Sequence, residues 1–386
     1  MKVAIIGGGG QLAEGVGSLL MQRGFDVGFY RPAWIDVPGV PRRPIRTSSR
    51  LSRVFVQRAA MAELDSFSFN YTWFDDPAAF SSAEVIIFAL PSFLAERLGG
   101  RLASALSGRI LLNLSDRFLG TYALAVAASD VAHFLPPRLG IAFNSPPLLA
   151  YQPLRDMETR VYFTKPFVMM SCFPQAGISE ATAIVAHLFG FRAGEIRVAP
   201  SMLHLAFENI NSILHSVQDL QNLRSREYGR PGYLYDPTAY TDRMVKRINA
   251  IAKERDVIAR TLDNVSFRSL EEFDGSTFRN SVAQSGTICG TAIYRHEHPL
   301  LRSIPRPSVY TAHGYEDVGW SMVPMESLAS SLRIRTPSLT ELINEWNSYM
   351  NVDYRRVGRS VSSLRLRKSN PVDSDPRMWD WRYGLL

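Results

Sequence analysis

The sequence contains few cysteines and no long apolar run. Cys172 and Cys289 are the only cysteines among 386 residues, and they form no CxxC pair, which favours two reduced, buried thiols over a disulfide or a catalytic thiol. No apolar stretch approaches the ~20 residues that a membrane helix needs, and the N-terminal run VAII is too short for a signal peptide. We therefore expect a cytoplasmic protein with no membrane partner.

The sequence also lacks long low-complexity tracts and basic helices. Lys and Arg number 43 and Asp and Glu number 36, which gives a formal net charge of +7. Without a patch that combines basic and aromatic residues, this excess does not indicate a nucleic-acid partner. A positive field also suits an enzyme that binds a polyanionic cofactor and carboxylate substrates. With 46% hydrophobic residues, the composition is that of a globular protein.

The first thirty residues have the pattern of a βαβ unit. The run KVAII predicts a strand, and apolar residues at helical spacing predict a helix over 12–23 that ends at Gly24. The run FDVGFY then predicts a second strand. A strand, a glycine-rich turn, a helix and a strand within ~30 residues are typical of a parallel sheet.

Later segments extend this sheet, and the pattern then changes. AEVIIFALPS and GRILLNLSD predict buried strands joined by a helix, RVYFTKPFVMMSCFP a strand or hairpin, and SEATAIVAHLFG a helix closed by Gly190. From about residue 200, apolar residues recur at helical spacing in several segments. One of these predicted helices has Thr336 or Ser338 as its candidate N-cap. We predict an α/β fold with a Rossmann-type doubly wound parallel sheet over 1–195, a mostly α-helical domain over 196–366 and a tail over 367–386. The tail is either loose or a docked strap.

Four glycines, at positions 7–10, join the first strand to the first helix. In a dinucleotide-binding turn, glycines allow a tight turn, a close approach to the pyrophosphate and close packing of helix on strand. The helix N-terminus then offers free N–H groups and a positive dipole end to the phosphates. Two registers fit the motif, one through Gly7, Gly9 and Leu12 and one through Gly8, Gly10 and Ala13. We favour the second, because a leucine suits the close-packing position poorly.

The second strand ends in Tyr30-Arg31, where an NAD-binding domain would carry an acidic residue. Such an acid accepts hydrogen bonds from the ribose 2′-hydroxyl, and the first carboxylate after this strand is Asp36. A guanidinium pairs bidentately with a phosphate, so Arg31 predicts the 2′-phosphate of NADP. The alternative is that Arg31 is a solvated loop residue.

Pro91-Ser92 follows the next buried strand, at the sheet edge where the nicotinamide half of a dinucleotide binds. The pair fits a cofactor contact and an ordinary strand-ending turn equally well. The residues that we expect to contact NADP are therefore Gly8, Gly10, Gln11, Leu12, Ala13, Arg31, Pro91 and Ser92.

Two stretches of the second domain carry polar residues of catalytic type. LAFENINSILHS includes Asn211 and His215, which are four residues apart and therefore share one helical face. HGYEDVGWSMVPMESLA includes Glu316-Asp317 before a segment rich in Gly, Trp and Pro. Taken alone, a histidine on an apolar helix is more often a core residue, and an acidic pair before a turn is usually solvated. Periodicity cannot join the two stretches.

Taken together, the stretches resemble the opine dehydrogenases, the octopine/nopaline dehydrogenase family, through nearly the whole chain. ENINSILHS keeps both asparagines and the histidine of the family's Asn-x-Asn-Pro and His-Pro motifs, although Ser212 and Ser216 replace the prolines. YEDVGWSMVPMESLA follows the second family motif, and DYRRVGRSVSSLRL matches the closing stretch. The glycine turn and Arg31 are more similar to the metallophore-making, staphylopine-type branch.

The resemblance implies a role for individual residues. It gives His215 as the general acid/base, Asp317 as the acid that hydrogen-bonds the other ring nitrogen, and Asn211 as a group for the substrate carboxylate or the nicotinamide amide. The ordinary pKa of a histidine, ~6.5, suits proton transfer near neutrality. Arg138 in LPPRLG is a further candidate for a substrate carboxylate, from its position alone. We expect no metal site, because the two histidines of RHEHP have no third ligand.

The resemblance therefore implies an NADPH-dependent opine-type dehydrogenase with a 6-phosphogluconate-dehydrogenase-like fold. It would join a 2-oxo acid, pyruvate or 2-oxoglutarate, to the amine of an amino acid or a nicotianamine-like metallophore precursor, through an imine reduced by hydride. The alternatives are another NADP reductase, of the ketopantoate or 2-hydroxy-acid type, and a non-catalytic NADP-binding sensor. A homodimer is the expected assembly.

Overall fold

A computed structural model of the chain shows two compact units, one that ends at Leu205 and one that begins at Ala206. The predicted domain boundary, between residues 195 and 196, precedes this division, and the predicted tail lies outside the described residues. The structure describes residues 1–8, 10–30, 32, 51–57, 64–70, 72–74, 76–151, 158–164, 167–209, 211–227, 241–261 and 314–364.

The first unit is built on an eight-stranded sheet in the order β12-β11-β8-β7-β6-β1-β2-β5. Every neighbouring pair is parallel except β8 with β11. The predicted Rossmann-type sheet is therefore confirmed, with one antiparallel step. The strands are β1 (Lys2–Ile6), β2 (Asp26–Tyr30), β5 (Thr72–Phe74), β6 (Val85–Phe88), β7 (Ile110–Asn113), β8 (Leu139–Phe143), β11 (Val168–Phe173) and β12 (Ile196–Val198).

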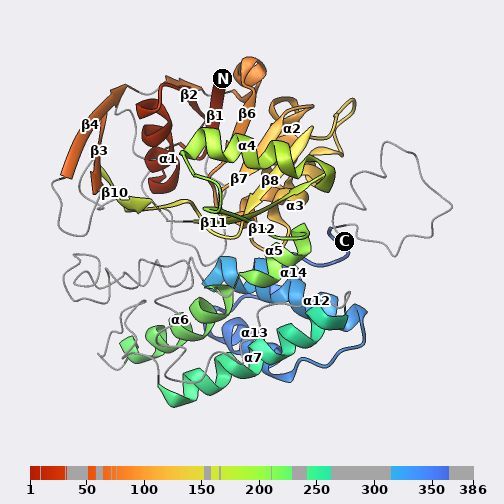
Figure 1. The fold of residues 1–386 in the computed structure, drawn as a ribbon. Helices are drawn as coiled ribbons and strands as arrows, with labels where there is room; N and C mark the ends of the chain where they lie inside the picture. The colour runs from red at the N-terminus through yellow and green to blue at the C-terminus, as the bar shows by residue number, and fades with distance from the viewer. Residues whose placement is uncertain are drawn as a thin grey trace. The chain divides into compact units, whose positions relative to one another are not determined.

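Helices cover both faces of this sheet, which explains why its central strands β1, β6, β7 and β8 are mostly apolar and buried. The helices are α1 (Gln11–Gln22), α2 (Ala95–Leu106), α3 (Gly120–Ala128) and α4 (Ile178–Phe189). α1 and α4 share one core with Val3 and Ile5 of β1, and α2 packs on α3 on the other face (Figure 1). Gly190 ends α4 with φ 77°, as predicted.

A second sheet of four strands, in the order β4-β3-β10-β9, was not predicted. Its strands are β3 (Leu51–Gln57), β4 (Leu64–Asn70), β9 (Leu148–Tyr151) and β10 (Glu158–Thr164). The run RVYFTKPFVMMSCFP, predicted as one strand or a hairpin, is divided between β10 and β11, which belong to different sheets. The prediction was wrong because propensity identifies strands but not their partners.

Cys172 lies in β11 as a buried free thiol, as predicted. Burial raises the pKa of this thiol to about 11, so the reactive thiolate is scarce near neutral pH. Cys289 lies outside the described residues. Among the helices that the structure describes, none is both long and apolar enough to cross a membrane.

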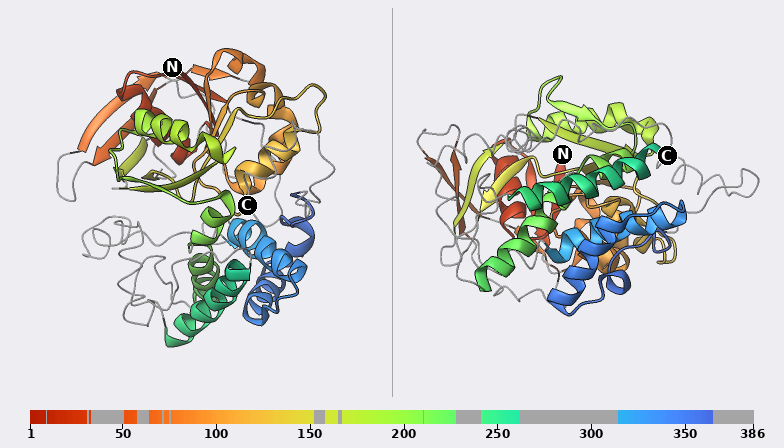
Figure 2. Two further views of the ribbon diagram at one scale, coloured as in Figure 1. Left: turned by 45° about the vertical axis from the view of Figure 1, so that its right-hand side comes forward. Right: turned by 90° about the horizontal axis from the view of Figure 1, so that it is seen from below.

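The second unit is helical in its described residues, as predicted (Figure 2). Its elements are α6 (Asn211–Glu227), α7 (Asp242–Thr261), the π-helical turn η6 (Val318–Met322), α12 (Val323–Ser331), α13 (Pro337–Met350) and α14 (Tyr354–Val357). The stripe that begins near residue 203 is two helices, because α5 (Met202–Glu208) ends before α6 begins.

The N-terminus of α13 is closed by another helix. Thr336 is the N-cap residue, as predicted, but its side chain makes no capping hydrogen bond. Instead, the carboxylate of Glu254 on α7 accepts hydrogen bonds from the backbone N–H groups of Ser338 and Leu339, at 2.7 and 2.9 Å. A negative charge at this end of a helix is favourable, so Glu254 ties α7 to α13.

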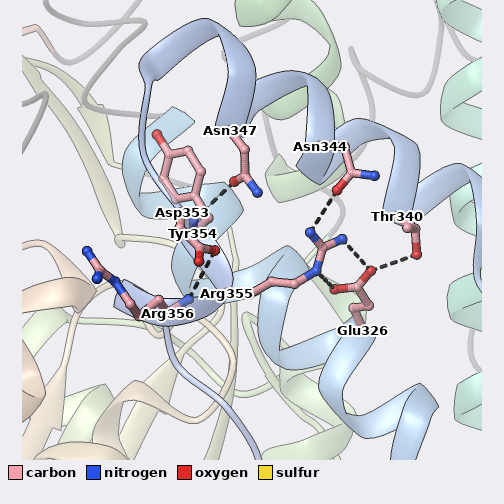
Figure 3. Close-up of polar contacts among 8 residues, drawn as sticks. All are labelled: Glu326, Thr340, Asn344, Asn347, Asp353, Tyr354, Arg355 and Arg356. Carbon is pink, nitrogen blue, oxygen red and sulfur yellow. Dashed lines mark hydrogen bonds and ion pairs between the residues drawn. The ribbon is translucent and has the colours of Figure 1, made fainter.

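Polar contacts fix the stretch DYRR on two other helices (Figure 3). Arg355 donates from Nε and Nη2 to the carboxylate of Glu326 on α12, at 2.6 and 2.8 Å. Its Nη1 donates to Asn344 on α13 at 2.7 Å, and the N–H of Tyr354 donates to Asn347 at 3.0 Å. This part of the family's closing stretch therefore joins α12 to α13.

Candidate functional site

Backbone hydrogen bonds hold the glycine turn of the first unit in place. The N–H groups of Gly7 and Gly8 donate to the carbonyl of Tyr30, at 2.9 and 3.1 Å, and the N–H of Gly10 donates to the carbonyl of Gly7 at 3.0 Å. Gly7 has φ +125°, and a Cβ there would lie 2.9 Å from the carbonyl oxygen of Ala89. Only glycine fits this position.

Helix α1 begins directly after the turn, with Gly10 as its N-cap and no side-chain capping hydrogen bond. The first-turn N–H groups of a helix have no intrahelical acceptors, which suits an anion. Ala13 is fully buried and Leu12 is half-buried, an arrangement that favours the register through Gly8, Gly10 and Ala13. Gly9 and the side chain of Gln11 lie outside the described residues.

Gly17 lies at a close contact between this helix and the sheet, and sequence reasoning did not single it out. A Cβ at this position would lie 2.2 Å from Cζ of Phe29 on β2. The signal was present in the sequence, since Gly17 is a second glycine on the helical face that carries Ala13.

The other residues predicted to contact the cofactor have different surroundings. Arg31 lies outside the described residues. Pro91 precedes a short 3-10 turn after β6, and the fully buried Ser92 donates from Oγ to the carbonyl of Arg117 at 3.5 Å. Arg138 is exposed and forms an ion pair with Glu180, so a partner within the first unit already occupies its guanidinium.

Strained backbone follows β7 at the same sheet edge. Phe118 and Leu119 have φ of 36° and 65°, and both are buried. Buried Asp116 holds the next helix by accepting hydrogen bonds from the N–H and Oγ1 of Thr121, at 2.5 and 2.6 Å. Strained residues are frequent at functional sites, and here they lie where a Rossmann-type sheet binds its ligand.

His215 and Asp317 meet in the interior of the second unit. His215 lies four residues after the first residue of α6, and Asp317 directly precedes η6. The ring Nδ1 lies 3.0 Å from Asp317 Oδ2, although 102 residues separate them in sequence. His215 is 8% exposed and Asp317 is 0% exposed. The contact expected from the resemblance is therefore present.

This contact sets the protonation pattern of the ring. An ionised carboxylate only accepts hydrogen bonds, so Nδ1 donates to Oδ2 and carries the proton of the neutral ring. Nε2 can then accept a proton in the neutral form and donate one in the charged form. The pair is able to perform general acid–base chemistry at Nε2.

Tight packing holds the turn that follows Asp317. η6 is π-helical, a geometry that is frequent at functional sites. A Cβ at Gly358 would lie 2.3 Å from the carbonyl oxygen of Gly319 in this turn, and the N–H of Arg359 donates to the same oxygen at 2.9 Å. The Gly-Arg of the closing stretch therefore supports the segment that presents Asp317.

The two serines that replace the family's prolines leave α6 intact. Ser212 and Ser216 lie inside the helix and are 2% and 0% exposed. Nε1 of Trp346 donates to the carbonyl oxygen of Ser216 at 2.8 Å, so α13 contacts the residue next to His215. Asn211, the predicted substrate residue, is the first residue of α6 and is half-buried.

A third titratable side chain of this cluster was not predicted. Asp219 lies one helical turn after His215 and is 0% exposed. Burial raises the pKa of its carboxyl well above the ordinary value, His215 opposes this shift, and Asp317 adds to it. Asp219 was missed because a charged residue of an amphipathic helix is expected on the solvent face. Residues 212–220 of α6 are instead buried on all sides.

Comparison with known proteins identifies relatives of the chain. The model of the NAD/NADP octopine/nopaline dehydrogenase alpha-helical domain matches residues 198–350, which include both His215 and Asp317. A curated opine dehydrogenase from Arthrobacter sp. (strain 1C) is 23% identical over 295 residues, 75% of this chain and 77% of that protein.

Three solved structures share the fold. An octopine dehydrogenase in complex with NADH and agmatine is 16% identical, with a TM-score of 0.67 over 95% of this chain and 96% of that one. A yersinopine dehydrogenase with NADP+ bound is 14% identical, with a TM-score of 0.64 over 100% and 98%. A 2-dehydropantoate 2-reductase from Geobacter metallireducens is 16% identical, with a TM-score of 0.60 over 90% and 100%. The predicted resemblance is confirmed: residues 198–350 match the alpha-helical domain of the octopine/nopaline dehydrogenase family, and the chain is similar to a curated opine dehydrogenase.

Proposed function

We propose that this protein is an NADPH-dependent opine-type dehydrogenase, an oxidoreductase that acts on CH–NH groups. The observation that carries the proposal is the buried 3.0 Å contact between His215 Nδ1 and Asp317 Oδ2, inside the residues that match the family domain. In the reductive direction, a 2-oxo acid and an amine form an imine, and hydride transfer reduces the imine carbon. The Arthrobacter opine dehydrogenase and the structure of octopine dehydrogenase support this choice of reaction.

In this proposal, His215 performs the proton transfers. The protonated ring donates from Nε2 to the oxygen of the oxo acid as the amine attacks, which gives a carbinolamine. The attacking nitrogen then returns a proton to Nε2, and a second donation from Nε2 to the hydroxyl lets this oxygen leave as water. In the reverse direction, the neutral ring accepts a proton at Nε2 from the attacking water. Asp317 keeps the Nδ1 proton in place, and its buried carboxylate stabilises the imidazolium.

The glycine turn fits the dinucleotide that we propose. Gly8 and Gly10 have no side chains to obstruct a pyrophosphate, and α1 begins with N–H groups suited to its charge. A nicotinamide dinucleotide supplies the hydride when it is bound. We assign the 2′-phosphate of NADP to Arg31 and the other contacts to Gln11, Leu12, Ala13, Pro91 and Ser92, as the sequence predicts. The solved structures hold NADP+ in yersinopine dehydrogenase and NADH in octopine dehydrogenase, which supports a nicotinamide dinucleotide, and the choice of NADP rests on Arg31.

The substrates that we propose carry carboxylates. Octopine dehydrogenase structures hold pyruvate in one case and L-arginine in another. We propose pyruvate or 2-oxoglutarate as the oxo acid, and an amino acid or a nicotianamine-like metallophore precursor as the amine. Asn211 is the residue of the helical unit that we assign to a substrate carboxylate or the nicotinamide amide. Arg138, which is paired with Glu180, stays a weaker prediction for the same role.

An assay of NADPH oxidation over a matrix of 2-oxo acids and amines tests the proposal. We expect oxidation only where an oxo acid and an amine are both present. The product should be a secondary amine whose mass equals that of the two substrates less one oxygen atom. An Asp317→Asn protein is the control for background oxidation, because it keeps the shape of the side chain but not its charge.

The same assay separates the alternative functions. Oxidation with an oxo acid alone would favour a ketopantoate or 2-hydroxy-acid reductase, to which the 2-dehydropantoate 2-reductase structure is related in fold. NADPH binding with no turnover in any combination would favour a sensor. We also propose a cytoplasmic homodimer, and light scattering after size exclusion measures the assembly.

A further inference from the structure

One buried side chain contacts both segments that bring His215 and Asp317 together. Trp346 lies on α13 and is fully buried. Its Nε1 donates a hydrogen bond of 2.8 Å to the carbonyl oxygen of Ser216, the residue after His215. The far edge of the same indole packs on Gly314, which precedes Asp317 by one turn, and a Cβ there would lie 2.1 Å from Cη2. A single rigid ring therefore contacts both parts of the chain.

Both contacts of the indole are made to the backbone. A buried indole N–H needs an acceptor, and a carbonyl oxygen has two lone pairs, so Ser216 can accept this bond beside its helical one. At Gly314, the three nearest atoms, Cη2, Cζ3 and Cζ2, all belong to the six-membered ring, so any larger side chain would displace the ring. Ser216 lies within α6, and Gly314 lies in the helical turn that leads into η6. The indole therefore defines where two stretches of backbone run.

Ion pairs fix the part of α13 that carries the indole. Oε2 of Glu345 lies 2.7 Å from Nη1 of Arg224 on α6, and its Oε1 lies 2.5 Å from Nη2 of Arg247 on α7. The ring of Tyr349 meets the indole edge-on, with 6.5 Å between the ring centroids and 80° between the planes. α13 can therefore neither slide along α6 nor turn about its own axis without losing one of these contacts.

On the basis of the proposed function, we infer that Trp346 is a positioning residue for proton transfer. Its hydrogen bond holds the turn of α6 that carries His215, and its packing on Gly314 holds the turn that carries Asp317. The indole thereby sets the separation of 3.0 Å between Nδ1 and Oδ2 of the pair. Such a role affects turnover, because a misplacement of about 1 Å can cost ~10²-fold in rate.

Trp346→Phe removes the indole N–H and the far edge of the ring together. In NADPH-dependent condensation, we expect kcat to fall by ~10–10²-fold, because the ring of His215 is then displaced from its productive position. The Kd for NADPH, which we assign to the first unit, should stay at the wild-type value. Leu339→Ala is the matched control, since it opens a cavity in the core of the same helix, two turns before Trp346. It should lower the Tm and keep a wild-type kcat, and an equal fall of kcat in both variants would show that Trp346 serves stability only.

Gly314→Ala tests the second contact and shows whether both contacts act through the same ring. Its Cβ would displace the indole, so Gly314→Ala alone should lower both kcat and Tm. In Trp346→Phe, the phenyl ring lacks the edge that this Cβ would meet. Adding Gly314→Ala to Trp346→Phe should therefore lower kcat no further. Additive losses of kcat would show that Gly314 acts independently of the indole, and they would overturn the inference.

A measurement on the ring of His215 separates this inference from the proposed function. In protein with isotope-labelled histidine, the proton that Nδ1 donates to Asp317 should give a slowly exchanging low-field NMR signal, which His215→Ala lacks. We expect this signal to move to higher field and to exchange faster in Trp346→Phe, and to stay in place in Leu339→Ala. An unmoved signal in Trp346→Phe overturns the inference alone. A wild type with no condensation activity towards any substrate pair overturns the proposed function, and the signal still decides whether Trp346 positions the pair.

Discussion

The glycine turn of the first unit and the His215–Asp317 pair of the second unit offer different kinds of atoms. The turn leads directly into α1, whose first-turn backbone N–H groups come from residues that are contiguous in the chain. The pair offers side-chain atoms from residues that are 102 apart in sequence. These atoms form their hydrogen bond in the buried interior of the unit. One short stretch can therefore encode a phosphate site, whereas a proton-transfer site depends on tertiary structure.

The largest expected effect is a loss of turnover without a loss of NADPH binding, which would separate the role of the His215–Asp317 pair from that of the glycine turn. His215→Ala should lower kcat by ~10²–10⁴-fold, because general acid–base catalysis is lost, while the Kd for NADPH stays at the wild-type value. Stopped-flow turnover and fluorescence titration with NADPH measure the two quantities. His204→Ala, on α5, is the control histidine and should keep wild-type turnover. Unchanged turnover in His215→Ala would remove this residue from the mechanism.

The next effect concerns the coenzyme alone. Arg31→Asp should raise the KM for NADPH by about 10–100-fold, because charge-assisted hydrogen bonds to a phosphate are lost and repulsion is added. The KM for NADH should change far less, so NADH is the internal control. Steady-state kinetics with each coenzyme measure the ratio. An equal response to both would show that Arg31 does not read the 2′-phosphate.

A glycine of the second unit should affect packing rather than ligand binding. Gly358→Ala should destabilise the protein by about 1–3 kcal/mol, because the new Cβ would lie 2.3 Å from the carbonyl oxygen of Gly319. We expect a lower kcat as well, since η6 follows Asp317 directly. Chemical denaturation measures the stability. Gly100→Ala is the control, because the nearest atom to its Cβ would be 3.8 Å away.

The smallest expected effect is a loss of stability when the N-terminus of α13 loses its cap, a contact to which we assign no part in catalysis. Glu254→Ala should destabilise the protein by ~1 kcal/mol, because the N–H groups of Ser338 and Leu339 lose their acceptor. Neither kcat nor the Kd for NADPH should change. Lys253→Ala, an exposed neighbour on α7, is the control and should leave stability unaltered. A lower NADPH affinity in Glu254→Ala would contradict the separation of the two regions.

The sequence predicted those parts of the fold that local patterns determine. The first βαβ unit, the helix closed by Gly190 and the start of α13 at Thr336 follow from glycine turns, periodicity and capping residues. The second sheet was missed, because β3 and β10 are far apart in the chain and nothing local marks them as partners. Strand pairing is a tertiary property.

The candidate site divides in the same way. The glycine turn could be predicted from its own residues, but the contact of His215 with Asp317 required the family resemblance. Asp219 and the cap from Glu254 could not be predicted, because each depends on what surrounds a helix. Arg31 lies outside the described residues, so its role stays a prediction.

The hydrogen bond from Trp346 to the carbonyl of Ser216 has a spectroscopic consequence. The indole is fully buried, and a Cβ at Gly314 would lie 2.1 Å from its ring, so its surroundings are closely defined. The ring contacts the residue next to His215 and carries none of the reacting atoms itself. A fluorinated tryptophan at this position would be a resident reporter, whose resonance follows ligand-induced changes at the active helix during a titration.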